Sequence, residues 1–165
     1  MTTNAIYDKS GSAITFKDAN GTVVFTLKDG VDLGNGQSSA IGDLGVTPRP
    51  MLYSWEARIK WVATPTLGDI VRIYAFCSDV SAEADLAADG DVTPETKFGN
   101  FVFMGQVVCS VAADQYFYGS GLIYLPRRYL VLGVWNASAT KDLNATSEAN
   151  VIKLTPIYPD IQAAA

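Results

Sequence analysis

The sequence predicts an all-β fold, an antiparallel β-sandwich of jelly-roll-like type with an amino-terminal hairpin or arm. The first observation is the alternation within residues 51–63, M-L-Y-S-W-E-A-R-I-K-W-V-A, in which the odd positions are apolar or aromatic and most even positions are polar. This alternation is typical of a strand with one buried and one wet face. The second is a composition of 48% hydrophobic against 18% charged residues over 165 residues, which suits one folded domain. The third is the aromatic content, 8 Tyr, 7 Phe and 3 Trp, which favours strands.

The first third of the chain predicts a hairpin followed by an irregular connection. Residues 13–16 and 22–27 are short β-branched and aromatic runs separated by an Asn-Gly pair, which supplies the positive φ angles of a tight turn. The Gly-rich stretch 29–45 then predicts a long irregular connection or a hinge. We therefore expect residues 1–50 to form an arm that precedes the sandwich domain at 51–159.

The main domain is expected to begin with residues 51–63 and 70–78 paired in a hairpin, because a short segment with Pro and Gly joins them. Residues 101–112 are apolar on both faces in their first half, so we expect a central strand there. The Gly-Ser-Gly triplet in residues 116–124 predicts a β-bulge. The remaining expected elements are a buried strand at 129–135, a closing strand at 151–158 and a flexible tail at 160–165.

Composition excludes several classes of function. The 12 basic and 17 acidic residues give a net charge of −5, which repels phosphate backbones, so we expect no nucleic-acid partner. No apolar run approaches the roughly 20 residues that span a bilayer, and the first residues lack a secretory signal, so we expect no membrane partner. The chain has no His, which removes the common general base and the commonest metal ligand. We expect a protein that is not an enzyme and that has no cofactor and no metal.

Two polar features leave alternatives open. The loop at 79–100 is rich in acidic residues, which we interpret as solvated charges. A catalytic carboxylate pair lacks an apolar pocket there, and a calcium site lacks the spacing of an EF-hand loop. Cys77 and Cys109 each share the parity of apolar neighbours, which favours buried free thiols over a disulfide.

A cluster of aromatic residues is the remaining candidate for a binding site. Tyr116, Tyr118 and Tyr124 are candidates for stacking against a sugar ring. Aromatic residues in strands are more often part of a core or a subunit interface, so a core or interface role is favoured over a sugar-binding role.

Several segments together carry a resemblance to a known class of proteins. They read S-W-E-A-R-I-K, G-D-I-V-R-I-Y-A-F-C-S-D, F-V-F-M-G-Q-V, Y-L-P-R-R-Y-L-V-L-G-V-W-N-A-S and S-E-A-N-V-I-K-L-T-P-I-Y. Between Tyr53 and Tyr158 the chain resembles virion structural proteins of tailed bacteriophages. The resemblance implies a capsid decoration or cement protein, or a head-fibre protein, with a jelly-roll-like fold and frequently a trimeric state.

From this resemblance we expect a non-enzymatic virion protein that decorates and stabilises the capsid. It would be made in the host cytoplasm, lie on the capsid surface, form a homotrimer and bind the major capsid protein of a phage. The contact is expected in the amino-terminal segment 5–27, at Ile6, Tyr7, Ile14, Phe16, Val24 and Phe25. The loop at 79–100 is expected to point outward. The alternative is a receptor-binding or carbohydrate-binding β-sandwich module of a fibre or tail.

Overall fold

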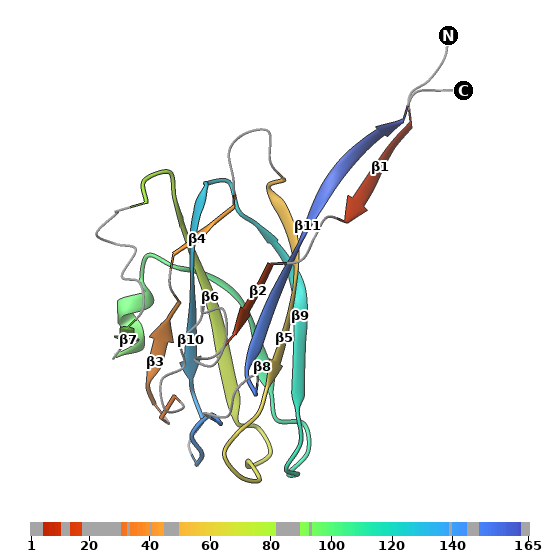
Figure 1. Ribbon diagram of the computed structural model, residues 1–165. Coiled ribbons are helices and arrows are strands. Elements are labelled where there is room, and N and C mark those ends of the chain that lie inside the picture. The colour runs from red at the N-terminus through yellow and green to blue at the C-terminus, as the bar shows by residue number, and fades with distance from the viewer. Residues whose placement is uncertain are drawn as a thin grey trace.

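The computed structural model (Figure 1) describes residues 5–10, 14–17, 31–32, 34–39, 41–44, 50–81, 90–92, 94–138, 140–144 and 149–162. The fold is all-β, and its strand pairs are antiparallel, as predicted. The strands are β1 (Ala5–Ser10), β2 (Ile14–Lys17), β3 (Gly36–Ser38), β4 (Gly42–Asp43), β5 (Leu52–Ile59), β6 (Ile70–Ser78), β7 (Gly90–Val92), β8 (Val102–Val108), β9 (Phe117–Tyr124), β10 (Tyr129–Asn136) and β11 (Val151–Gln162). Within the described part of the chain, the 3₁₀ turn η1 (Glu95–Phe98) is the only helix.

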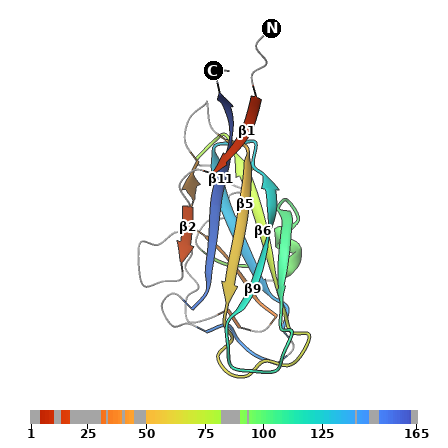
Figure 2. The same ribbon diagram turned by 90° about the vertical axis from the view of Figure 1, so that its right-hand side faces the viewer.

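The strands form two sheets that share one core. Sheet A has the order β1-β11-β5-β9, with β2 also paired to β11, and sheet B has the order β7-β3-β10-β6-β8, with β4 also paired to β10. Figure 1 shows sheet B on the left and sheet A on the right, and Figure 2 looks onto sheet A. The buried core takes Trp55 and Ile59 from β5, Ile73 from β6, Leu132 from β10 and Leu154 from β11. Residues of both sheets therefore belong to one buried core.

The alternation predicted for residues 51–63 is confirmed from Tyr53 to Trp61, whereas Met51 and Ala63 at its two ends are exposed. Tyr53, Trp55, Ala57 and Ile59 are buried, whereas the intervening residues of β5 are exposed or half-buried. The predicted hairpin with residues 70–78 is wrong, because β5 lies in sheet A and β6 lies in sheet B. Each strand carries one apolar face, and the two faces meet across the core rather than side by side.

The prediction of a central strand at residues 101–112 is also wrong. β8 is the edge strand of sheet B, and its pairing with β6 shifts by one residue between Ile73 and Tyr74. Val102 and Phe103 are exposed, although Phe103 contacts the ring of Tyr74 with centroids 5.6 Å apart. Phe103, on the second apolar face of β8, thus belongs to an aromatic cluster outside the core.

The glycines of β9 serve a different purpose from the expected bulge. The pairing of β9 with β5 runs without a shift from Phe117 opposite Ile59 to Tyr124 opposite Leu52. A Cβ atom at Gly121 would lie 2.8 Å from Nε1 of Trp55, and one at Gly105 in β8 would lie 2.5 Å from the same indole. Glycine is therefore required where the β8 and β9 backbones approach Trp55.

The amino-terminal region belongs to both sheets. β2 pairs with β11, while the other half of the expected hairpin, residues 22–27, lies outside the described residues. The stretch 29–45, expected to be irregular, contributes β3 and β4, which pair with β10. Local sequence gave no sign of these pairings because a two- or three-residue strand next to glycines shows no alternation.

A two-stranded ribbon extends from sheet A. Residues 157–162 of β11 pair with β1, in a register from Ala5 opposite Gln162 to Ser10 opposite Ile157. Figure 1 shows this ribbon projecting away from the two sheets. Residues 160–162 of the expected flexible tail lie in β11, and residues 163–165 lie outside the described residues.

Buried polar side chains hold the loops at one end of the sheets. Asn136 is fully buried, and its amide group donates hydrogen bonds to the carbonyl oxygens of Val31 and Lys141, both at 2.9 Å. Its Oδ1 accepts a hydrogen bond from the backbone N–H of Ser138 at 3.1 Å. One side chain thus connects the segment at Val31 with the loop that follows β10, and it pairs with backbone groups that lie outside the strands.

Candidate functional site

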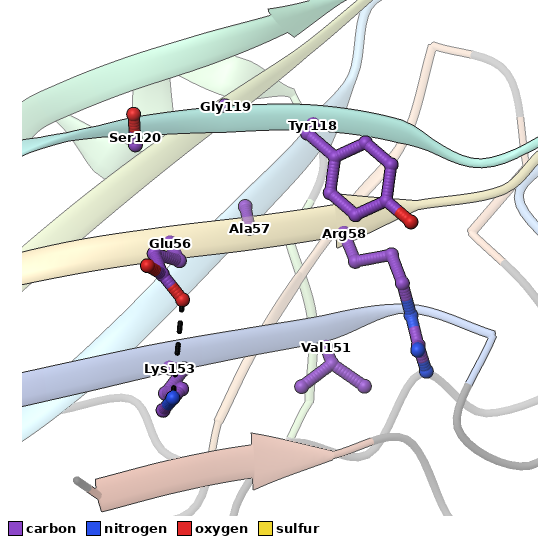
Figure 3. Close-up of a pocket in the computed structure, with 8 residues that line it drawn as sticks. All are labelled: Glu56, Ala57, Arg58, Tyr118, Gly119, Ser120, Val151 and Lys153. Carbon is purple, nitrogen blue, oxygen red and sulfur yellow. Dashed lines mark ion pairs between the residues drawn. The ribbon is translucent and has the colours of Figure 1, made fainter.

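A groove on the outer face of sheet A is the strongest candidate for a binding site (Figure 3). It has a volume of about 650 Å³, within the range of small-molecule sites. Three neighbouring strands supply its lining: Glu56, Ala57 and Arg58 of β5, Tyr118, Gly119 and Ser120 of β9, and Val151 and Lys153 of β11.

The strand register explains how these side chains come together. Arg58 lies opposite Tyr118 on one side and Val151 on the other, which makes one row across the sheet. Glu56 lies opposite Ser120 and Lys153, which makes the next row on the same face. Between the rows, Ala57 lies opposite Gly119 on one side and Ile152 on the other, and the side chains of Ala57 and Ile152 are buried in the core.

The groove carries charges of both signs. Lys153 Nζ lies 3.9 Å from a carboxylate oxygen of Glu56, and Figure 3 shows this ion pair on the side of the groove away from Tyr118. The guanidinium of Arg58 lies over the ring of Tyr116, 4.8 Å from its centroid. Two cations and one carboxylate therefore line the groove in a chain whose net charge is −5.

The three tyrosines predicted to stack on a ligand all lie on this face but do not form one platform. Tyr118 lines the groove, with 71% of its surface exposed and no ring contact to the described residues. Tyr124 is six positions further along β9, roughly 20 Å away at the usual strand rise, and its hydroxyl lies 3.0 Å from the sulfur of Met51. Tyr116 lies under Arg58 and Lys60.

The residues predicted to contact a capsid are placed only by their backbones. Ile6 and Tyr7 lie in β1, and Ile14 and Phe16 lie in β2. Val24 and Phe25 lie outside the described residues. The capsid contact stays a prediction.

Sequence reasoning missed the polar lining of the groove. Glu56 and Arg58 were interpreted only as the wet face of a strand, and Ser120 and Lys153 were not singled out. The alternation within each strand could have placed these side chains on an outer face. It could not have shown that they lie together, because the pairing that aligns residues 56, 120 and 153 joins strands far apart in sequence.

The outer face of sheet B carries a cluster of aromatic and charged side chains, and part of the acidic loop covers this cluster. Part of the acidic loop folds back as η1, and Phe98 stacks on Tyr74 with ring centroids 5.0 Å apart. Glu95 accepts hydrogen bonds from Arg72 Nη1 at 2.8 and 2.7 Å and from the Tyr74 hydroxyl at 2.5 Å. This segment of the loop at 79–100 therefore packs on the sheet instead of pointing outward.

These contacts also bear on the alternatives for the acidic loop. The carboxylate of Glu95 is paired with the guanidinium of Arg72 and with the Tyr74 hydroxyl. Among the residues that the structure describes, no three His, Cys, Asp or Glu side chains are grouped as metal ligands. Residues 82–89 lie outside the described part of the chain, so a calcium site there stays an open alternative.

The Tyr74 contacts predict a stability change at high pH. Burial, followed by the hydrogen bond to Glu95, raises the pKa of Tyr74 from 10.0 to about 12. A raised pKa in the folded state means that the neutral phenol contributes stability that is fully present below pH 10.0 and is lost as the pH rises toward about 12. The free energy of unfolding, measured in urea across this window, should therefore fall more steeply in the parent protein than in Tyr74→Phe. Equal slopes would contradict the role of this hydroxyl.

Neither Cys77 nor Cys109 forms a disulfide, as expected. Cys109 is buried, and burial raises the pKa of its thiol, which donates a hydrogen bond to the carbonyl oxygen of Val111 at 3.2 Å. Cys77 is half-buried. A raised pKa keeps a thiol protonated and unreactive, so Cys109 has a structural role.

Comparisons with known proteins do not assign the chain to a family. No helix in the described part of the chain has the length and apolar character needed to cross a membrane. No protein-family model matches the sequence, and no curated protein is significantly similar to it.

Proposed function

We propose that the chain is a non-enzymatic structural protein of a phage virion, a jelly-roll-like sandwich that decorates and stabilises the capsid as a homotrimer. The proposal joins the resemblance of residues 53–158 to virion proteins with two features of the fold. These are the order of strand pairing and the ribbon formed by β1 and β11. The ribbon is the observation that carries the proposed attachment.

The strand pairing supports the jelly-roll part of the proposal. In an eight-stranded jelly roll the antiparallel partners are nested, so the first strand pairs with the eighth, the second with the seventh, the third with the sixth and the fourth with the fifth. When the eight strands are taken as β2, β3, β5, β6, β8, β9, β10 and β11, the four expected pairs are β2–β11, β3–β10, β5–β9 and β6–β8. All four occur in the two sheets.

The ribbon supports a role in attachment. A two-stranded ribbon alone has little stability in water, because it has no second layer to pack against. Its strands also present backbone groups at their edges, which can add to the edge of a neighbouring sheet. We propose that the ribbon docks on the major capsid protein and that the two sheets remain above it as a rigid body.

A structural role also fits the chemistry of the side chains. A decoration protein performs no reaction and stabilises a particle by burying surface at sites repeated by its symmetry. The chain has no His, and the groove on sheet A is an open hollow on a sheet face.

Removal of β1 tests the attachment. Deletion of residues 1–12 should leave the pairs β11–β5 and β5–β9 intact, so the chain should keep a β-type circular dichroism spectrum and its trimeric state in light scattering. Its binding to undecorated heads of the parent phage, measured by co-sedimentation and electron microscopy, should be lost.

A matched control is Tyr118→Ala, which lies on the body of sheet A and should bind heads as the parent protein does. Full binding by the truncated chain would remove the ribbon as the anchor. Failure of the intact chain to bind these heads would remove capsid decoration as the function, and a monomer in light scattering would remove the trimer.

A further inference from the structure

We propose that the groove on sheet A binds a carboxylated sugar, such as a hexuronic or sialic acid residue of a surface polysaccharide. The sugar ring would stack on Tyr118, and its carboxylate would face Arg58 and Lys153. This site is separate from the proposed capsid anchor, since the groove lies on the body of sheet A and the anchor is the ribbon of β1 and β11.

The exposed ring of Tyr118 is the first step of the argument. An aromatic ring that is 71% exposed, with no ring or cation contact to the described residues, leaves a flat apolar face in water beside a hollow. The C–H face of a pyranose ring is apolar and flat, and stacking on a phenol ring removes both surfaces from water. Tyr116 does not offer such a face, because Arg58 and Lys60 cover it.

The charges select an acidic sugar over a neutral one. Arg58 and Lys153 supply two positive charges to the lining, and Glu56 supplies one negative charge. The guanidinium of Arg58 is held by its contact with the Tyr116 ring, which fixes the plane of its N–H donors. A carboxylate is a planar acceptor that suits such a donor. A local excess of positive charge in a chain of net charge −5 is complementary to an acidic ligand.

The remaining groups suit the hydroxyls of a sugar. Ser120 and Glu56 lie in the row next to Tyr118 and Arg58, and both offer oxygen atoms to hydroxyl groups. Two rows across three strands cover roughly 10 Å by 7 Å at normal sheet spacings, which matches one or two sugar rings. The pairing of β5 with β9 and β11 makes this floor rigid, so binding requires little ordering of the site.

Titration calorimetry with tetragalacturonate as the probe tests the proposal. We expect saturable binding by the parent protein, weaker binding as the salt concentration rises, and roughly tenfold weaker binding by both Tyr118→Ala and Lys153→Gln. Tyr118→Phe should bind as the parent does, because it keeps the ring. Tyr124→Ala is the matched control, since this tyrosine is 62% exposed on the same strand and lies outside the groove.

Two further ligands test which acidic sugar binds and whether its carboxylate is needed. Sialyllactose tests a sialic acid in place of a hexuronic acid, and binding by either acid supports the proposal. Methyl-esterified tetragalacturonate has the same rings without the charge and should bind at least tenfold more weakly.

Three results would overturn the assignment. These are equal binding of the methyl ester, equal loss of binding in Tyr124→Ala, and no saturable binding of either acid. A Tyr118→Ala variant that turns a parent oligomer into monomers, while the parent binds no sugar, would assign the groove to a contact between copies of the chain. Because Tyr118 and Lys153 are exposed, superimposable thermal unfolding curves should show that each variant is folded.

Discussion

Replacing Trp55 by alanine is expected to lower the free energy of unfolding by about 3–5 kcal/mol. The indole is only 2% exposed and lies in the core between the sheets. Gly105, Gly119 and Gly121 have no side chains to fill the space that its removal leaves, and their strands are held in place by their pairing. The cavity should therefore persist, which places the cost at the upper end for a core substitution.

Urea denaturation of the parent protein and of Trp55→Ala measures this difference. Tyr124→Ala removes a large aromatic side chain from the outer face of the neighbouring strand, and a change within about 0.5 kcal/mol is expected there. A loss smaller than about 1 kcal/mol for Trp55→Ala would mean that the sheets close around the vacated space, contrary to the expected rigidity of the glycine-lined contact.

Replacing Asn136 by alanine is expected to lower the free energy of unfolding by about 2–3 kcal/mol, because three hydrogen bonds of a buried side chain are lost together. The carbonyl oxygen of Lys141 and the N–H of Ser138 would lose this partner, whereas the carbonyl oxygen of Val31 keeps its hydrogen bond from the N–H of Leu143 at 2.9 Å. Asn136→Asp keeps the size and one acceptor but removes both donors and buries a charge, so it should be at least as destabilising.

Thermal unfolding followed by circular dichroism measures both Asn136 variants. Asn100→Ala, at an exposed position after η1, is the control and should unfold as the parent does. An Asn136→Ala protein with an unchanged melting temperature would show that water or a shifted loop satisfies the backbone groups of Ser138 and Lys141.

The sequence predicted which face of a strand is buried much better than it predicted which strands pair with each other. Alternation placed Tyr53, Trp55, Ala57 and Ile59 in the core, and the buried run at residues 129–135 is indeed β10, which lies inside sheet B. Parity is a local property, so it is readable from one strand. Which strand lies alongside depends on packing across the whole chain, which explains why β5 and β6 were predicted as a hairpin but lie in different sheets.

The errors at β8 and β9 have a related origin. A glycine in a strand indicates either a bulge or a close approach of another group, and the sequence near Gly121 does not name the approaching group. Here it is Trp55, which is 66 positions earlier in the numbering and lies on the paired strand β5. In the same way, Glu95 was expected in solvent, and its partners Arg72 and Tyr74 come from β6.

The candidate site was predictable only in its aromatic part. Tyr118 was one of three tyrosines predicted to stack on a ligand, and the structure places it at the groove. The contribution of Lys153 depends on β11 lying next to β5, and that of Ser120 depends on β9 lying on the other side. No local pattern specifies those two neighbours.

The nested order of the strand pairs has a consequence for how the chain is made. The innermost pair, β6 with β8, joins segments that leave the ribosome close together in time, whereas β2 waits for β11. Sheet A therefore lacks β11 until residues 151–162 have been made, and until then one edge of β5 has no partner strand. Such distant pairings slow folding, so we expect sheet A to form only after β11 has been made, over milliseconds to seconds.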